Sequence, residues 1–368
     1  MTQSQVAYVG LGSNLGDCQQ ILQQAIMALG KVKQTQVLRH STWRQTEPLG
    51  GMDQPSYLNG VAELTTSLEP AQLLTSLQTI ESDMGRQRSG RWDARTLDLD
   101  LLLMDQACIH TSDLVVPHPQ MHLRSFVLEP LVELSPVLMH PVLQCEVTQL
   151  LERLNHGNFV VQPEAPRLIS IAGNIGLGKS TLARQLHDRL GGEFLPEPYR
   201  TNPFLARLYQ GQHELALDAQ LYFLVKRSEQ LAPGHCRDGQ FYWSDYWFQK
   251  ELIFARRLLD SEQLDLYERI YQGFVETVTH PTVVIYLKGT VDLCLKRIEQ
   301  RHRDYEQNIT PDFLAALAQD YDSMMAHWQQ SPVIQLEVPA FDCLCEQDCD
   351  WLLRQIKAYV EPDKRVNP

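Results

Sequence analysis

The sequence predicts two domains, an α+β domain followed by an α/β domain built around a parallel sheet. A chain of 368 residues is too long for one typical core and suits two. A turn-rich segment with two prolines, residues 155–166, lies near the middle of the chain. After it, strands alternate with long helices, whereas before it strands are interspersed with only two helices.

We expect the first domain to span residues 1–158 and the second to span residues 167–368, with a short linker at 159–166. Apolar alternation and helical spacing predict the elements of the first domain in order. They are a strand at 6–11, a helix at 18–29, strands at 37–46 and 57–66, a helix at 70–84 and a strand at 96–104. This mixture is typical of an α+β sandwich.

The predicted strands of the second domain are short and apolar, as buried parallel strands usually are. They cover residues 168–172, a segment ending at Glu197, and residues 241–244 and 282–287. A helix is expected at 181–190, and further long helices should fill the intervals between the other strands.

The composition argues against several classes of function. With 32 basic and 45 acidic residues, the net charge of −13 argues against broad nucleic-acid binding. No stretch is long and apolar enough to span a membrane, and the first five residues do not resemble a signal peptide. We therefore expect a cytoplasmic protein whose partners are small molecules, with no nucleic-acid or membrane partner.

Eight cysteines are scattered along the chain, and in such a protein they should be reduced thiols. One cluster contains Cys343, Cys345 and Cys349. It lacks paired C-x-x-C spacing and a nearby histidine, so we do not expect a metal site there.

A glycine-rich loop opens the second domain. Residues 173–180 read Gly-Asn-Ile-Gly-Leu-Gly-Lys-Ser and stand between a predicted strand and a predicted helix. Backbone N–H groups of such a loop surround a polyphosphate, Lys179 neutralises its oxygens, and the Ser180 hydroxyl can hold one Mg²⁺. The predicted ATP-binding residues are Gly173, Asn174, Ile175, Gly176, Leu177, Gly178, Lys179, Ser180 and Thr181.

In the first domain, charged residues concentrate between positions 85 and 100. Four arginines fall within ten residues there: Arg86, Arg88, Arg91 and Arg95. Asp98 and Asp100 follow on a predicted strand, where a period of two puts both carboxylates on one face. Such a pair suits an Mg²⁺–polyphosphate complex, and arginines stabilise charge on a transferring group. The alternative interpretation is a solvated basic loop beside an edge strand.

Four motifs of the first half occur in the order found in one enzyme family. They are Tyr8-Val-Gly-Leu-Gly-Ser-Asn-Leu-Gly16, Tyr57-Leu-Asn59, the run from Arg91-Trp92 to Asp100, and Val116-Pro-His-Pro119 followed by Arg124. Over residues 3–155 the chain therefore resembles 6-hydroxymethyl-7,8-dihydropterin pyrophosphokinase, an enzyme of folate biosynthesis. The resemblance implies a ferredoxin-like sandwich that transfers pyrophosphate from ATP to a pterin hydroxymethyl group and releases AMP.

The same resemblance implies roles for particular residues. Asp98 and Asp100 would hold two Mg²⁺ ions. The residues implied for the polyphosphate are Arg86 and Arg95, which would be catalytic, and His118 and Arg124, which would contact ATP. Those implied for the pterin are Thr46, Tyr57, Asn59, Phe126 and Trp92. Of these, Trp92 would close over the substrate on a mobile loop. An acidic residue near both substrates falls at Glu81. The glycine run at 10–16 has the wrong spacing for a dinucleotide fingerprint and would be the exit turn of the first strand.

Three features of the second half indicate which kind of molecule accepts the phosphoryl group. Glu197 ends a predicted strand, where a carboxylate can take a proton from an attacking hydroxyl. Gln220 lies on an otherwise apolar helix, where its amide can contact a base edge, although an exposed helix glutamine is an equal alternative. The arginines of residues 296–306 are typical of a lid over phosphates, and the alternative there is a solvated charged helix.

Over residues 167–360 this arrangement resembles the deoxyribonucleoside kinases. The resemblance implies a P-loop fold that transfers the γ-phosphoryl group of ATP to a 5′-hydroxyl. The implied nucleoside-binding residues are Glu197 (the general base), Tyr209, Gln220, Asp245 and Glu306, and those for ATP phosphates are Arg297, Arg301 and Arg303. The family has an acidic-Arg-Ser triplet, in which Tyr246 takes the arginine's place here, and Lys250 is a candidate for the missing charge.

The leading hypothesis is a bifunctional enzyme of folate biosynthesis and deoxynucleoside salvage. ATP is the co-substrate of both halves, Mg²⁺ serves both, with two ions in the first site and one in the second, and the favoured nucleoside is a purine. The kinase resemblance also predicts a homodimer through helices at 251–259 and 264–278. The alternative is that the second half is a non-catalytic nucleotide-sensing or oligomerisation module.

Overall fold

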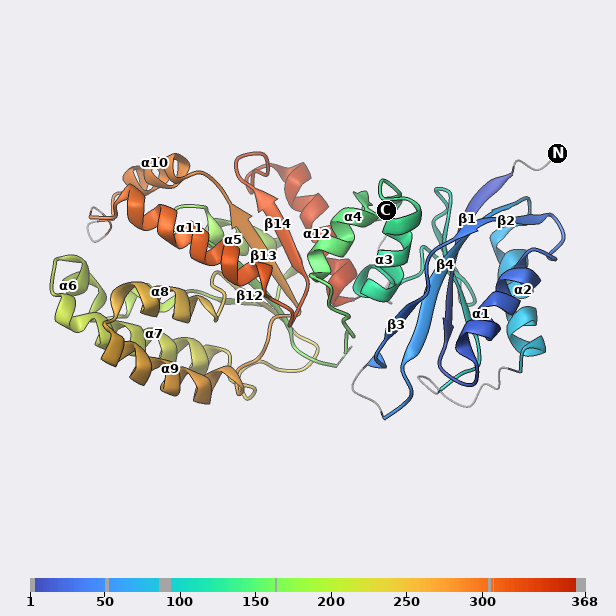
Figure 1. Ribbon diagram of the computed structural model, residues 1–368. Coiled ribbons are helices and arrows are strands. Elements are labelled where there is room, and N and C mark those ends of the chain that lie inside the picture. The colour runs from blue at the N-terminus through green and yellow to red at the C-terminus, as the bar shows by residue number, and fades with distance from the viewer. Residues whose placement is uncertain are drawn as a thin grey trace. The chain divides into compact units, whose positions relative to one another are not determined.

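The computed structural model describes residues 4–49, 53–85, 94–162, 164–303, 306 and 308–361. The chain folds into two compact units, each with its own β-sheet (Figure 1). One unit holds the residues up to Val160 together with Glu361, and the other holds Val161–Val360. The division falls inside the segment 159–166 that we predicted as a linker.

The first unit is an antiparallel sheet with α1 and α2 on one face and α3 and α4 on the other (Figure 1). Its strands are β1 (Gln5–Ser13), β2 (Thr35–His40), β3 (Arg44–Thr46), β4 (Tyr57–Thr66) and β5 (Asp98–Met104). Its helices are α1 (Cys18–Leu29), α2 (Pro70–Asp83), α3 (Ser125–Leu134), α4 (Val147–Leu154) and the 3₁₀ turn η2 (Met121–Leu123). Two hairpins are formed by β6 (Ile109–His110) with β7 (Val115–Val116) and by β8 (Met139–His140) with β9 (Cys145–Glu146). The sheet order β2-β4-β1-β5, with β3 also on β4, confirms the predicted α+β class.

Alternation along the strands separates a core face from a site face. Val9, Leu11 and Leu99 are buried in a core shared with α1 and α2. Because successive strand residues point to opposite faces, Asp98 and Asp100 point away from this core and line a cavity.

Two expectations for the first unit were wrong. The predicted strand 37–46 is broken because the chain leaves the sheet at 41–43. Thr42 donates from its N–H and its hydroxyl to Glu133 of α3, both at 2.7 Å, and the Trp43 ring covers Gly60, where a Cβ would lie 2.6 Å from it. The run 10–16 is also not a turn throughout, because β1 is paired with β4 as far as Ser13.

The second unit is a five-stranded parallel sheet in the order β11-β12-β10-β13-β14, which confirms the predicted α/β class. Its strands are β10 (Arg167–Gly173), β11 (Glu193–Leu195), β12 (Phe241–Ser244), β13 (Val283–Lys288) and β14 (Val333–Glu337). Its α-helices are α5 (Lys179–Leu190), α6 (Leu205–Tyr209), α7 (Ala216–Gln230), α8 (Lys250–Leu258), α9 (Ser261–Val275), α10 (Val291–Arg301), α11 (Pro311–Ala326) and α12 (Glu346–Val360). Two 3₁₀ turns are η3 (Pro198–Arg200) and η4 (His213–Leu215).

The parallel order brings the ends of three strands together. The phosphate loop follows the central strand β10, Asp245 follows β12, and Glu197 stands two residues beyond β11 rather than ending it. Carboxyl ends of neighbouring parallel strands meet at one edge, where ligands of such sheets bind. In the part of the chain that the structure describes, no helix is both long and apolar enough to cross a membrane.

Candidate active sites

The first unit contains a cavity of about 460 Å³ on the site face of its sheet. Gly10 and Gly12 of β1 form its floor, between β4 and β5. In this register Gly12 lies between Asn59 and Asp98, and a Cβ added to Gly12 would lie 3.0 Å from Asn59 Oδ1. The missing side chains therefore keep the space between the two neighbouring strands open.

Asp98 and Asp100 form the acidic wall of this cavity. Arg95 Nη1 donates to Asp98 Oδ2 at 2.8 Å. Burial lowers the pKa of Arg95, but the charge of Asp98 outweighs it and the pKa is raised. Among the described residues, no cluster of three or more His, Cys, Asp or Glu could hold a metal by itself. Two carboxylates on one strand face nevertheless fit Mg²⁺, which commonly binds one or two carboxylates together with substrate phosphates.

The cavity also presents amide, aromatic and basic side chains. Asn59 Nδ2 donates to Thr46 Oγ1 at 2.7 Å. Arg124 Cζ lies 5.8 Å from the centre of the Phe126 ring, and its Nη2 donates to Gln120 Oε1 at 2.7 Å. Across β1, Asn59 lies two strand spacings from Asp98, roughly 10 Å. The flat Phe126 ring lines the same cavity.

The second unit contains a cavity of about 360 Å³ at the carboxyl edge of its sheet. Lys179 Nζ donates to the carbonyl oxygens of Gly173 and Asn174, both at 2.8 Å. Burial and the nearby charge of Lys250 lower the pKa of Lys179 to about 8. Gly176 has φ +89°, and a Cβ there would lie 2.7 Å from the Cys294 carbonyl, so the loop requires glycine.

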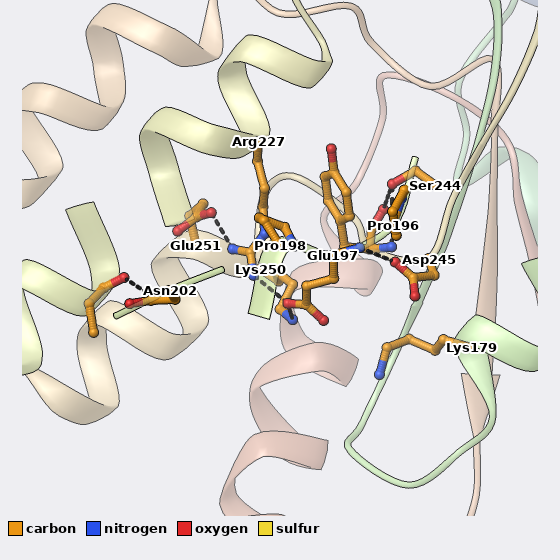
Figure 2. Close-up of polar contacts among 12 residues, drawn as sticks. Lys179, Pro196, Glu197, Pro198, Asn202, Arg227, Ser244, Asp245, Lys250 and Glu251 are labelled. Carbon is orange, nitrogen blue, oxygen red and sulfur yellow. Dashed lines mark hydrogen bonds and ion pairs between the residues drawn. The ribbon is translucent and has the colours of Figure 1, made fainter. Parts of the chain in front are cut away.

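In this cavity Glu197 is held by two cations (Figure 2). Its Oε1 accepts from Lys250 Nζ at 2.5 Å and also from Arg227 Nη2. Burial raises the pKa of Glu197, but the charges of Lys250 and Arg227 outweigh burial and hold it well below its usual range. Arg227 also pairs with Glu251, which accepts from the Tyr267 hydroxyl at 2.5 Å. Glu197 is therefore ionised and fixed beside the phosphate loop.

Comparisons with known proteins separate the same two parts of the chain. Residues 8–136 match the family 7,8-dihydro-6-hydroxymethylpterin-pyrophosphokinase (HPPK), and residues 169–361 match the family deoxynucleoside kinase. A 2-amino-4-hydroxy-6-hydroxymethyldihydropteridine pyrophosphokinase of Haemophilus influenzae is 42% identical over 147 residues, which are 40% of this chain and 91% of the relative.

A deoxyguanosine kinase of Bacillus subtilis is 33% identical over 166 residues, which are 44% of this chain and 80% of the relative. The chain belongs to both families. It is a fusion of a pterin pyrophosphokinase and a deoxynucleoside kinase. A solved deoxyadenosine kinase from M. mycoides, with dCMP and dCDP bound, shares 22% identity with a TM-score of 0.45 and covers 52% of this chain and 98% of that one.

The pterin pyrophosphokinase cavity collects most of the residues predicted for it. Those lining it are Thr46, Tyr57, Asn59, Arg95, Asp98, Asp100, His118, Arg124 and Phe126. The other predicted residues of this site, Arg86 and Trp92, lie outside the described residues, as do Arg88 and Arg91. Glu81 is not among the described residues that line the cavity. Its buried Oε1 accepts from the Leu99 N–H at 2.8 Å and so holds β5 between the two aspartates.

Asn14 was not predicted, although it positions Arg95. It is buried, its Oδ1 accepts from the Arg95 N–H at 2.8 Å, and its own N–H donates to the Arg95 carbonyl at 3.2 Å. Its Nδ2 also donates to the Pro55 carbonyl at 3.3 Å. The only signal in the sequence is its place in the run 10–16, which by itself indicates a turn.

The deoxynucleoside kinase cavity also collects most of its predicted residues. Those lining it are Gly173, Ile175, Gly176, Gly178, Lys179, Ser180, Thr181, Glu197, Tyr209, Gln220, Arg301, Arg303 and Glu306. Arg301 forms a two-pronged ion pair with Glu306 at 2.5 and 2.6 Å. The carboxylate predicted for the sugar therefore adjoins an arginine predicted for the phosphates.

Four predicted residues lie in or near the phosphate loop but are not among the described residues that line the cavity: Asn174, Leu177, Asp245 and Arg297. Asn174 Nδ2 donates to the Leu314 carbonyl at 2.8 Å, and Arg297 Nη1 donates to the Leu177 carbonyl at 3.2 Å. Both contacts fix the loop backbone. Asp245 is buried, and its Oδ1 accepts from the Glu197 N–H at 2.6 Å. Burial raises the pKa of Asp245, and a hydrogen bond with Ser180 opposes this shift.

Arg227 lines the kinase cavity but was not predicted from the sequence. It lies seven residues after Gln220 on α7, so both side chains share one helix face, and both line the cavity. Tyr246, which takes the place of the family arginine, donates to Gln230 at 2.9 Å instead. The charge near Glu197 therefore comes from two other elements, α7 and α8.

Proposed function

We propose that the first unit transfers a pyrophosphoryl group from ATP to 6-hydroxymethyl-7,8-dihydropterin. The observation that carries this is the pair Asp98 and Asp100 on β5, across the glycine floor from Asn59 on β4, in a cavity that Phe126 also lines. The hydroxymethyl oxygen bonds to the β-phosphorus, the bond from that phosphorus to the α,β-bridging oxygen breaks, and AMP leaves. Two Mg²⁺ ions bound by the aspartates would neutralise phosphate charge, while Arg95 contacts the polyphosphate.

Replacing one metal-binding carboxylate tests this proposal. Asp98→Asn should lower pterin pyrophosphorylation by about 100-fold or more, because both charge and one oxygen ligand are lost. Deoxynucleoside phosphorylation by the same preparation should be unchanged. Asp113→Asn, at an exposed acid of the same unit, is the matched control. Retained pterin activity in the Asp98 variant would contradict the assignment.

We propose that the second unit transfers the γ-phosphoryl group of ATP to the 5′-hydroxyl of a purine deoxynucleoside. The carrying observation is Glu197 fixed beside the phosphate loop in one cavity. Its carboxylate accepts the hydroxyl proton, the oxygen bonds to the γ-phosphorus, and ADP leaves. Ser180 and Asp245 adjoin each other and would hold one Mg²⁺. The choice of a purine is supported by similarity to a deoxyguanosine kinase.

A substrate screen and one variant test the second activity. Of the four deoxynucleosides offered with ATP–Mg²⁺, a purine should be phosphorylated fastest. Glu197→Gln should lower kcat by about 100-fold or more while ATP still binds. Glu193→Gln, at an exposed residue of the preceding strand, is the matched control. Equal turnover by Glu197→Gln would remove the general-base assignment.

The contacts of Glu197 weigh against the alternative that the second unit is a non-catalytic nucleotide-sensing or oligomerisation module. That alternative rests on Tyr246, which takes the place of the family arginine. Lys250 and Arg227 both pair with Glu197, which weighs in favour of catalysis. We further propose a cytoplasmic homodimer that pairs through α8 and α9, supported by the family resemblance, and sedimentation velocity of the full chain would test the dimer.

A further inference from the structure

We propose that Lys250 is a catalytic residue of the kinase unit. Its ammonium pairs with Glu197 before the reaction and donates to the transferring phosphoryl group during it. This inference rests on the kinase function proposed above. It assigns to the first residue of α8 a contact with the reacting atoms.

The position of Lys250 supports such a contact. It lines the same cavity as Lys179 and Glu197 and is 6% exposed. In Figure 2 the Lys250 ammonium, the Glu197 carboxylate and the Lys179 ammonium point into the same space. A phosphoryl group held by the loop and attacked by a hydroxyl at Glu197 must pass between Glu197 and Lys179. The Lys250 ammonium lies 2.5 Å from one end of that path.

The hydrogen bonds of the two cations at Glu197 distinguish their roles. Arg227 is 3% exposed, and its two terminal nitrogens are engaged by Glu197 and Glu251. An ammonium has three donors, and Glu197 is the one hydrogen-bond acceptor of Lys250 among the described residues. Arg227 therefore fixes the carboxylate, whereas Lys250 retains donors for oxygen atoms of a ligand.

Proton transfer gives the ammonium a reason to change partners. The 5′-hydroxyl proton moves to Glu197 while the new O–P bond forms and the bond to the β,γ-bridging oxygen breaks. Glu197 becomes neutral, so its attraction for Lys250 falls. A buried ammonium without a paired charge is costly. The equatorial oxygens of the transferring group carry negative charge at that moment and are the nearest alternative acceptors.

Three variants of the full chain test the contribution of Lys250 to turnover. Lys250→Met keeps the apolar stem and removes the charge, and it should lower kcat about 100-fold. Binding of ADP–Mg²⁺ should change by less than about threefold, which also shows that the unit is folded. Lys250→Arg should recover part of the loss. Lys226→Met, at a half-exposed lysine of α7 paired with Glu229, is the matched control and should resemble wild type.

A second measurement separates direct contact from an effect through Glu197. In the Glu197→Gln background, binding of ADP, aluminium fluoride and the deoxynucleoside mimics the transferring group without turnover. Adding Lys250→Met should weaken this complex by at least about tenfold while ADP binding stays unchanged. Unchanged affinity would overturn the phosphoryl contact.

The outcomes also distinguish this inference from the function on which it rests. A wild-type chain that phosphorylates no deoxynucleoside would overturn both. A wild-type chain that turns over, with an equally active Lys250→Met variant, would overturn the role of Lys250 alone.

Discussion

In the kinase cavity, one carboxylate is surrounded by three cationic side chains. Lys179, Lys250 and Arg227 surround Glu197, and burial lowers the pKa of the two lysines. Phosphates are the charges that such a loop is built to receive. A bound nucleotide therefore changes the protonation of the site as well as its occupancy.

Proton uptake on nucleotide binding follows from Lys179. Its pKa of about 8 leaves it mostly charged at pH 7 and mostly neutral at pH 8.5. Phosphate charge raises that pKa again, so binding should take up about 0.7 proton at pH 8.5 and under about 0.1 at pH 7. Calorimetric titrations with ADP–Mg²⁺ in buffers of different ionisation enthalpy measure this number. Lys226→Met should behave as wild type, and an uptake that does not change with pH would exclude Lys179 as its source.

Residues that act within one local segment were predictable, and residues that act through distant partners were not. The phosphate loop and the Asp98–Asp100 pair are each defined by a few consecutive residues. Arg227 pairs with Glu197 and Glu251, which are 30 and 24 positions away along the chain. A single arginine on an apolar helix face does not indicate such partners. Helix spacing to Gln220 was the one available signal.

At the level of elements, the pterin site depends on two glycines that lie on one face of β1. Gly10 and Gly12 place backbone where other strands place side chains, and β4 and β5 supply the walls. Strand alternation explains both the core and the cavity. The same alternation located strands along the sequence, but it did not predict the break at 41–43, because Thr42 bonds to Glu133, 91 residues later.

Filling the floor should close the site without unfolding the strand. In Gly12→Val the new Cβ would lie 3.0 Å from Asn59 Oδ1, and its methyl groups would occupy the cavity. Valine suits strands, so stability should change by less than about 1 kcal/mol, whereas KM for the pterin should rise at least about tenfold. Steady-state kinetics and urea unfolding measure the two effects. Gly30→Ala is the control, because its added Cβ would have no neighbour closer than 3.6 Å. An unchanged KM would place the pterin elsewhere.

In the part of the chain that the structure describes, each unit has one five-stranded sheet, and the pterin and kinase cavities are each lined by residues of one unit. Each unit can therefore have its own response to conditions. The first unit contains a buried histidine, His140, which is 4% exposed and packs edge-on against His122 with ring centres 6.3 Å apart. Its Nδ1 accepts from the Leu143 N–H at 3.2 Å. Burial, and then the neighbouring His122, lower the pKa of His140 to about 3.

Acid should therefore destabilise the first unit through His140. Below pH 6.5 the unfolded chain binds a proton at this position and the folded unit does not, so the free energy of unfolding falls until the folded pKa of about 3 is reached. The loss between pH 7 and pH 5 should be about 2 kcal/mol. Hydrogen exchange of β1 and β5 amides, followed by mass spectrometry at both pH values, reports this unit separately from the other.

One substitution identifies the titrating group. His140→Asn keeps a hydrogen-bond acceptor for Leu143 but cannot take up a proton, so the difference between pH 7 and pH 5 should shrink by about 2 kcal/mol. His110→Asn, at an exposed histidine of the same unit, should retain the full difference. If the His140 variant keeps the same acid sensitivity as wild type, the proton is bound elsewhere, and burial of this ring does not set the acid limit of the pterin pyrophosphokinase unit.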